Sequence, residues 1–487
     1  MSTHCDRRTF LKSTAALTML AALARSPQGR AAAANLTPMP RAKQPGLVRG
    51  AFFYPSQEVV VAGECEDGWS KHGWSTWPGN QFEPEQQQAK FMEKLGEMTE
   101  GLDVDLRMDD AAIYTDAGIE AFIADIRQTK PEALLLINFW NSFSQKIYPI
   151  LDAYDGPIIV YHPVGANHQL PPERFRTEPR MQYIHAIEHW DALERGLRAV
   201  HAKNRMRQSR LLRVSGKLEQ EADDHEGFFD MPIHGVPAGH FNDLFDAIEI
   251  TPEMRELAET VRKQATSVTD LADNAFLDAV RAHAAVLELM ARHDADAITI
   301  ECLFLKHRKP CLSFAINNGA LVPCGCENDL NASLTLMLGA NLFSRGGFQH
   351  NPEFDTEENH YFGSHCTCLT KLHGPDGDDA PYALRPFFHQ LPKTLALDVI
   401  WPPGERVTLC KYNSNEKRLD AWAGELISSP SCPPTGGCAS RVLVKMDGVD
   451  DICSIYPGPH PVIYCGDFAR QMKTFAELYE LDLRTNA

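Results

Sequence analysis

Short apolar runs alternate with helical segments along the first third of this chain, and this alternation most restricts its fold. Strands are expected at residues 47–54, 133–139 and 157–162, and a helix at residues 83–100 separates the first two. Strands separated by helices pair in parallel, because the chain must cross over the sheet before the next strand begins. A parallel sheet with crossover helices is therefore predicted for an N-terminal α/β domain over residues 45–170.

The pattern continues and then changes near residue 315. Residues 171–314 predict a second, consecutive α/β (Rossmann-like) domain, in which no Gly-x-Gly-x-x-Gly motif or Walker-type loop follows a predicted strand. From residue 315 the sequence becomes rich in Pro, Gly and short β-like runs, for example residues 406–412 and 440–446. These runs predict a β-rich, barrel-like C-terminal domain over residues 315–487.

The N-terminus has the features of an export signal. Arg7 and Arg8 lie in the run Arg-Arg-Thr-Phe-Leu-Lys, which precedes a mildly apolar stretch at residues 15–24 and four alanines at residues 31–34. This order of basic, apolar and small residues resembles a twin-arginine signal peptide. We therefore expect residues 1–34 to be removed and the protein to be periplasmic or otherwise exported by the twin-arginine route.

Charge and hydropathy restrict the partners. The formal net charge at pH 7 is −18. Nucleic acids and anionic membrane surfaces both attract basic protein faces, so neither is expected as a partner. Outside the signal, the most apolar stretch is residues 133–140, which is too short to span a bilayer.

Five hard metal ligands are scattered over the last third of the chain: Glu301, Glu327, Asp329, His365 and His460. Glu301 ends an apolar run that predicts a buried strand, so its carboxylate is expected at the strand end, where active sites of α/β folds lie. Glu327 and Asp329 lie in a loop that opens an apolar helix, and helix capping is the alternative explanation for either acid. Carboxylates with an imidazole suit Mn²⁺ or another divalent cation better than a structural zinc.

Polar and aromatic residues follow two strands of the N-terminal domain. Trp140 follows the strand at residues 133–139, and His162, Asn167 and His168 lie at or after the end of the strand at residues 157–162. Loops in this position face the ligand crevice of an open α/β layer. These four residues are therefore candidates for substrate contacts, with ordinary polar loops as the alternative.

Cysteine spacing suggests one local disulfide. Cys432 and Cys438 close the short loop Cys-Pro-Pro-Thr-Gly-Gly-Cys, which is the expected place for a disulfide in an exported protein. The Cys-x-Cys pairs that begin at Cys324 and Cys366 cannot easily bridge themselves. A zinc site built from these pairs is the alternative.

Several segments together resemble the L-fucose isomerase and L-arabinose isomerase superfamily, in an exported and poorly characterised branch. They are residues 298–302, 309–318, 326–329, 363–366 and 457–467. The resemblance covers most of the mature chain and is strongest from Ile298 onwards. It implies two α/β domains before a β-rich domain, with Mn²⁺ bound by two acids and one or two histidines. Carried over, Glu301 matches the first acid, Glu327 or Asp329 the second, and the histidines are His365 and His460.

The resemblance implies an aldose–ketose isomerase. Such an enzyme moves a proton between C1 and C2 of an open-chain sugar through a cis-enediolate, which requires a base, an acid and stabilisation of negative charge. Glu301 is expected to be the base, and Glu327 or Asp329 the acid or a metal ligand. The family also implies a homo-oligomer, a trimer or hexamer, in which loops near Trp140 and His162 close a neighbour's pocket.

Two other functions fit the same residues. One is an exported carbohydrate-binding protein on this scaffold without isomerase activity. The other is a metal-assisted sugar epimerase or lyase that uses the same enediolate chemistry. The sugar itself is not determined by the sequence.

Overall fold

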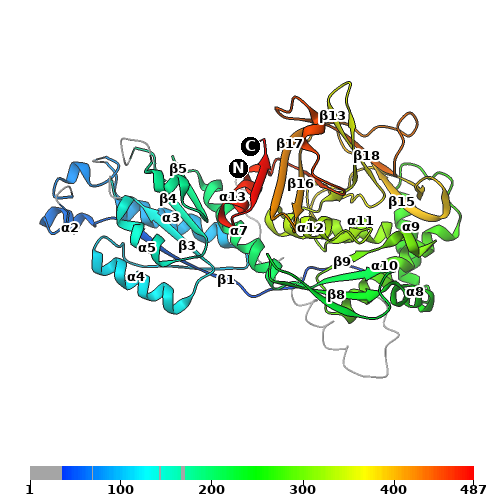
Figure 1. Ribbon diagram of the computed structural model, residues 1–487, viewed down its shortest axis with the longest axis horizontal. Helices are drawn as coiled ribbons and strands as arrows, with labels where there is room; N and C mark the ends of the chain where they lie inside the picture. Colours follow the sequence, from blue (N-terminus) through cyan, green and yellow to red (C-terminus); the bar gives the residue numbers. More distant parts are fainter. Residues whose placement is uncertain (1–35, 68–69, 80, 142–143, 166–170, 487) are drawn as a thin grey trace, which may run out of the picture. The chain divides into compact units, whose positions relative to one another are not determined.

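The computed structural model describes residues 36–486, apart from residues 68–69, 80, 142–143 and 166–170. The expected signal peptide, Asn167 and His168 therefore lie outside the described residues. The described part is a mixed α/β structure with two largely parallel sheets and a curled antiparallel sheet (Figure 1). This agrees with the predicted mixed α/β class with parallel sheets and a β-rich, barrel-like part.

The first sheet is parallel throughout, as predicted, with the strand order β2-β1-β3-β4-β5. Its strands are β1 (Gly46–Phe53), β2 (Val104–Met108), β3 (Ala133–Asn138), β4 (Ile158–Pro163) and β5 (Met181–Ala186). Because β5 pairs with β4, this sheet extends past residue 170, the predicted end of the first domain.

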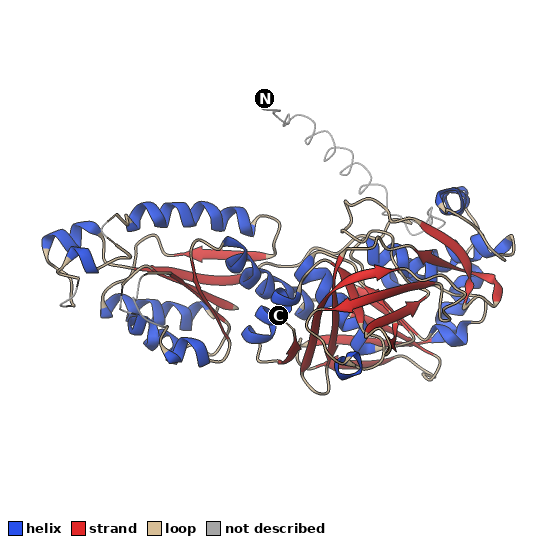
Figure 2. Cartoon of the chain, turned by 90° about the horizontal axis from the view of Figure 1, so that it is seen from above, coloured by secondary structure: helices blue, strands red, loops and turns tan. Residues whose placement is uncertain are grey.

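Helices cover both faces of the first sheet, as Figure 2 shows. They are α2 (Gln57–Ala62), α3 (Pro84–Thr99), α4 (Asp116–Thr129), α5 (Tyr148–Ala153), α6 (Glu173–Thr177) and α7 (Trp190–Arg207). Successive side chains of β3 point to opposite faces. Leu135 and Ile137 pack in one cluster with α3 and α7, whereas Leu134 and Leu136 pack in another with α4 and α5. Burial on both faces explains why β3 is a continuous apolar run.

The second sheet has the order β10-β9-β6-β8-β7 and is parallel except for β7, which pairs antiparallel with β8. Its strands are β6 (Leu211–Ser215), β7 (Ala222–Glu226), β8 (Met231–Pro237), β9 (Ala297–Ile300) and β10 (Cys324–Cys326). Parallel pairing thus continues beyond residue 315, where a change was predicted. The three residues Cys-Gly-Cys of β10 include no β-branched or aromatic side chain, so nothing in them predicted a strand.

Five helices accompany the second sheet: α8 (Ala238–Ala247), α9 (Pro252–Gln264), α10 (Asn274–Arg292), α11 (Cys311–Gly319) and α12 (Leu330–Phe343). Helix α12 is apolar on all sides because it is enclosed by β9 and β10 together with α7 and β16. Gly325 allows α12 to approach β10, since a Cβ at this position would collide with Ser333. The first turn of α12 is thereby held at one edge of the second sheet.

The third sheet is antiparallel and curls into a half-barrel (Figure 1), with the order β11-β19-β16-β17-β18-β13-β12 and with β20 parallel beside β17. Its strands are β11 (Phe348–Gln349), β12 (Asn351–Asp355), β13 (His360–His365), β16 (Arg406–Asn413), β17 (Arg418–Ser428), β18 (Ser440–Met446), β19 (Val462–Cys465) and β20 (Asp482–Thr485). A separate hairpin joins β14 (Tyr382–Phe387) and β15 (Leu391–Val399), and α13 (Ala469–Leu478) precedes β20. Leu409, Leu426 and Val444 pack against Trp401 in the core of this region.

The expected disulfide between Cys432 and Cys438 is wrong, because both cysteines are free. Cys438 instead packs with Cys366 in a small buried cluster. Strands β13 and β18 are neighbours, and the pairing of His365 with Ser440 brings the segments next to these cysteines together. Local spacing suggested the wrong partner because sheet pairing, a long-range effect, decides which thiols meet.

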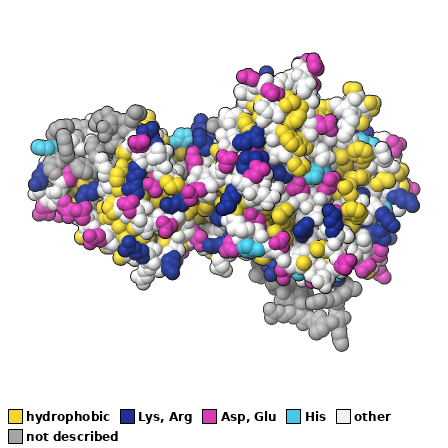
Figure 3. Space-filling view, viewed as in Figure 1, with side chains coloured by type: hydrophobic (Ala, Val, Ile, Leu, Met, Phe, Trp, Pro, Cys, Tyr) yellow, Lys and Arg dark blue, Asp and Glu magenta, His cyan; other side chains and the backbone are white. Residues whose placement is uncertain are grey.

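The surface mixes charges of both signs. On the face drawn in Figure 3, acidic and basic side chains are interspersed. Across the described ranges, no helix combines the length and the apolar character needed to cross a membrane.

Candidate metal centre

Glu327, His365 and His460 come together from three separate elements. Glu327 lies in the loop between β10 and α12, His365 ends β13, and His460 precedes β19. Their ligand atoms all lie within 4.8 Å of one another. The carboxylate oxygens of Glu327 are 3.5 Å from His365 Nε2 and 3.4 Å from His460 Nε2. One carboxylate and two imidazoles therefore surround a space of the size of a single ion.

The buried ring of His365 has an unsatisfied nitrogen in this centre. Its side chain is 2% exposed, and Nε2 makes no hydrogen bond with any described residue. The other nitrogen, Nδ1, is 3.2 Å from Thr367 Oγ1. A buried polar atom without a partner costs about 1–3 kcal/mol. In metal sites one ring nitrogen binds the ion while a hydrogen bond holds the other, and His365 has this arrangement.

Asp329 contacts the centre through His460. Its Oδ2 is 3.0 Å from His460 Nδ1, and its Oδ1 accepts a hydrogen bond of 2.8 Å from the Ala332 N–H as the N-cap of α12. Asp329 therefore does both: it caps α12 and it contacts a histidine of the converging group. Asp329 orients the ring so that Nε2 of His460 is directed towards Glu327.

Lys411 contacts the loop that carries His460. This lysine on β16 is buried, and its Nζ donates to the carbonyl of Pro459 at 2.6 Å and to that of His460 at 3.2 Å. It also lies 3.5 Å from both carboxylate oxygens of Asp329. The ammonium group of Lys411 therefore contacts both the backbone and the Asp329 carboxylate that position His460.

The close charges change the proton affinities of the centre. The imidazoles of His365 and His460 beside the Glu327 carboxylate hold its pKa well below its usual range, although burial opposes them. Burial lowers the pKa of His460, but Asp329 and Glu327 outweigh it and raise this pKa to about 9. In the metal-free chain His460 is therefore an imidazolium at neutral pH, and its proton takes the place of a cation between two carboxylates.

Two of the three converging residues have a left-handed backbone. The φ angles are 59° at Glu327 and 49° at His460. Residues other than glycine rarely adopt this conformation, which costs about 1–3 kcal/mol. Near Glu327, two hydrogen bonds from Gln349 help to offset this conformational cost. The Gln349 amide accepts from the N–H of Cys326 at 2.7 Å and donates to its carbonyl at 3.0 Å. Both side chains are thus aimed by a conformation that the surrounding contacts maintain.

Glu301 lies at the same sheet edge but points elsewhere. It follows β9 as Glu327 follows β10, and the two strands pair in parallel with Ile300 opposite Cys326. Its Oε2 accepts hydrogen bonds of 2.8 Å from Ser215 Oγ and from the Gly216 N–H at the end of β6. The side chain is not part of the converging group. The structure therefore separates Glu301, a fixed hydrogen-bond acceptor, from the three converging residues.

Trp140 and His162, the predicted substrate residues that the structure describes, are both buried. Trp140 Nε1 donates to Ser70 Oγ at 2.9 Å, and His162 Nδ1 lies 3.2 Å from the hydroxyl of Tyr183. Burial lowers the pKa of His162 to about 3, so this ring is neutral. Within one chain these two side chains belong to the interior of the first α/β region and not to the converging group.

Four supporting residues were missed in the sequence: Ser215, Gln349, Thr367 and Lys411. Two of them, Lys411 and Thr367, could have been recognised in the sequence. A lysine inside an apolar strand, as at Lys411, is rarely buried without a partner, and Thr367 lies two residues after a candidate ligand. Ser215 and Gln349 look like ordinary polar residues, because their partners are distant in the sequence.

No protein-family model matches this chain, and no curated protein is significantly similar to it in sequence. The resemblance to the isomerase superfamily thus stays a prediction. The chemistry of the centre rests on its own geometry.

Proposed function

We propose that Glu327, His365 and His460 bind one divalent cation, with Asp329 as the partner that orients His460. The observation that carries this proposal is the buried Nε2 of His365, which faces the Glu327 carboxylate without a hydrogen bond to a described residue. Two imidazoles and a carboxylate suit Mn²⁺, Fe²⁺ or Zn²⁺. Mn²⁺ is the ion that the family resemblance implies.

We further propose that the protein is a metal-dependent enzyme that interconverts an aldose and a ketose. The bound cation supplies stabilisation of the negative charge that grows on the two sugar oxygens next to the moving proton. Glu301 is the proposed base: its carboxylate takes the proton from C2 of the aldose and returns it to C1, while the hydroxyl proton of O2 passes to O1. Ser215 and Gly216 hold this carboxylate in one orientation, and pre-organisation of this kind favours proton transfer.

Location and assembly complete the proposal. The N-terminal segment with Arg7 and Arg8 directs the folded protein out of the cytoplasm, and several copies assemble into a homo-oligomer. Replacing both arginines by lysine should leave an unprocessed precursor in the cytoplasm. Light scattering of the mature protein should give a trimer or hexamer, and a monomer at working concentration contradicts the assembly.

The test is isotope exchange with a panel of sugars. The mature protein is stripped of metal, reloaded with Mn²⁺ and incubated with aldoses and ketoses in D₂O, and the products are identified by NMR. Isomerisation gives the partner sugar with deuterium at C1 or C2, and the Glu301→Gln variant gives neither. Binding of a sugar without exchange or product identifies a carbohydrate-binding protein instead. Exchange with an epimer or a dehydrated product identifies the epimerase or lyase.

A further inference from the structure

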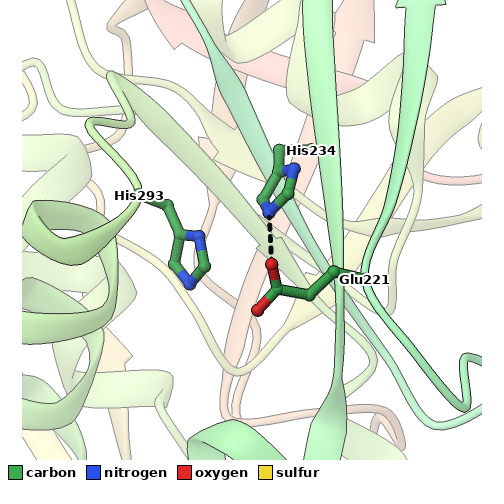
Figure 4. Close-up of side chains that lie close together, drawn as sticks. All are labelled: Glu221, His234 and His293. Carbon is green, nitrogen blue, oxygen red and sulfur yellow. Dashed lines mark hydrogen bonds and ion pairs between the residues drawn. The ribbon is translucent and has the colours of Figure 1, made fainter.

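A second group of metal-ligand side chains lies at the opposite edge of the second sheet. The Glu327 loop follows β10, which is one edge strand, whereas β7 and β8 form the other edge. Here Glu221 precedes β7, His234 lies on β8, and His293 caps the C-terminus of α10 (Figure 4). The ligand atoms of these three residues all lie within 4.8 Å of one another.

The contacts within this group resemble a first coordination shell without an ion. His234 Nε2 is 3.3 Å from one carboxylate oxygen of Glu221, and His240 Nδ1 is 3.5 Å from the other. The rings of His234 and His293 are 4.9 Å apart between centroids and are inclined by 32°. Figure 4 shows the His234 ring next to the Glu221 carboxylate and the His293 ring beside both. Glu221, His234 and His293 thus converge, and His240 contacts the same carboxylate from α8.

An aspartate orients one of these rings. Asp223 Oδ1 is 2.7 Å from His234 Nδ1, which directs the other nitrogen of the ring towards Glu221. A carboxylate on the outer nitrogen of a ligating histidine is a common feature of metal sites. The same relation joins Asp329 to His460 at the first centre.

The surroundings favour a cation. His293 lies at the C-terminus of α10, where the helix dipole contributes partial negative charge. Asp243 adds a carboxylate to a cleft of about 520 Å³ that Glu221, His240 and His293 also line. Arg292 is the basic residue of this cleft, and its charge is paired with Glu288 at 2.9 Å.

We infer that Glu221, His234 and His293 form a second metal site, with His240 next to the carboxylate as a fourth ligand, for a borderline transition-metal ion such as Zn²⁺. In a tetrahedral zinc site the ligand atoms lie roughly 3.3 Å apart, so the ligand atoms of Glu221, His234 and His293 must approach one another by about 1.5 Å at most, and His240 must turn towards them. The partly exposed side chains of Glu221 and His240 allow this by rotation. The bound ion connects the β7–β8 hairpin to the end of α10. This site does not depend on the proposed function.

A third group has a less suitable geometry. His373 Nε2 is 3.6 Å from Glu405, but it is Nδ1 of the same ring that faces Cys465, at 3.8 Å. One imidazole binds one ion through only one nitrogen, so these contacts do not converge on a single point. In the Glu221 group, by contrast, His234 uses Nε2 towards Glu221 and keeps Nδ1 for Asp223.

The test removes the first centre and counts the remaining zinc. The Glu327→Gln/His460→Gln variant, stripped of metal, is titrated with Zn²⁺ in a calorimeter. One equivalent should still bind, and adding His234→Gln or His293→Gln should weaken that binding at least 100-fold. The matched control is His225→Gln, because His225 lies on the same hairpin, is paired with Asp230 at 3.0 Å and is outside the group. It should leave the affinity unchanged.

A second measurement tests the same site if the double variant does not fold. Glu221→Gln should bind one equivalent of Zn²⁺ fewer than the otherwise unchanged chain, whatever the number bound at the first centre. Zinc should also slow hydrogen exchange of residues 222–237 and 289–293. The inference is overturned if the double variant keeps its circular dichroism but binds no zinc, if His293→Gln binds as tightly as its parent, or if His225→Gln weakens binding equally.

Discussion

The two candidate metal centres use the same kinds of side chain at opposite edges of one sheet, but they differ in burial. At the first centre the His365 side chain is 2% exposed, whereas the Glu221 side chain of the second is 45% exposed. Water can reach the second group and satisfy its polar atoms. It cannot reach His365 Nε2. The comparison teaches that burial, more than the choice of ligands, decides how strongly a site depends on its cation.

The largest expected effect is that of removing the carboxylate from the less exposed of the two proposed centres. Glu327→Gln should lower Mn²⁺ affinity more than about 100-fold, since even outer-sphere partners contribute 10–100-fold, and turnover should be lost with it. The exposed counterpart, Glu221→Gln, should leave Mn²⁺ binding at the first centre unchanged. Electron paramagnetic resonance of free Mn²⁺ measures both. Full Mn²⁺ stoichiometry in Glu327→Gln would remove the first centre from the comparison.

Glu301→Gln should separate catalysis from binding at the first centre. Loss of a general base typically lowers the rate by about 10²–10⁴-fold. Metal affinity should change little, because Glu301 is bonded to Ser215 and Gly216 and a glutamine oxygen can accept the same hydrogen bonds. Steady-state kinetics and Mn²⁺ titration are compared with a Ser215→Ala variant as the control for orientation. If affinity falls as far as in Glu327→Gln, Glu301 is a ligand and not the base.

The two centres should respond differently to pH. The pKa of His460 is raised to about 9, so metal must displace its proton, and affinity should fall about tenfold per pH unit from pH 9 to 7. Burial and His234 lower the pKa of His293, so that ring needs no deprotonation in this range. Calorimetry in buffers of different ionisation enthalpy measures the protons released. Equal pH slopes at both centres would contradict this difference.

The same proton makes a stability prediction for the metal-free chain. The folded pKa of His460 exceeds the unfolded value of about 6.5, so its stabilisation is complete below pH 6.5 and is lost as pH rises through 9. The melting temperature, relative to that of His460→Gln, should therefore decline over this range. The charged and titratable groups around His460 are Glu327, Asp329, His350, His365 and Lys411.

The smallest effects concern the two orienting aspartates. Asp329→Asn keeps the N-cap of α12, because asparagine caps as well as aspartate, but it should weaken metal binding about 10–100-fold. Asp223→Asn should weaken Zn²⁺ binding at the second centre by less, since Asp223 is 88% exposed and water screens its charge. Metal titration of both variants, with melting temperatures as the control for folding, tests the ranking. Equal losses would show that burial does not set the strength of these contacts.

Much of the first α/β region could be predicted from periodicity. Strands at β1, β3 and β4 and the helix α3 agree with their predicted positions to within a few residues, because apolar runs and amphipathic helices are local patterns. β7 could not be predicted. Its sequence Ala-Asp-Asp-His-Glu is charged and mostly exposed, and it is a strand because it pairs with β8.

The second metal group was missed for the same reason. Glu221 lies just before β7, whose Asp223 pairs with His234 of β8, and His293 reaches them from a helix far along the chain. Nothing in their spacing resembles a metal motif. A group of this kind becomes visible when the pairing of the strands is known.

The amino-acid sequence alone determined the alternation of strands and helices, the loop that carries Glu327 and Asp329, and the placement of Glu301 at a strand end. These follow from local periodicity and from the rule that parallel strands end at one edge. Tertiary packing decided the rest: Glu327 turns to two histidines, Asp329 to the outer nitrogen of one of them, and Glu301 to Ser215 and Gly216. The physical reason is that a buried carboxylate turns towards its nearest donors, and sheet pairing and helix packing bring those donors from distant parts of the chain.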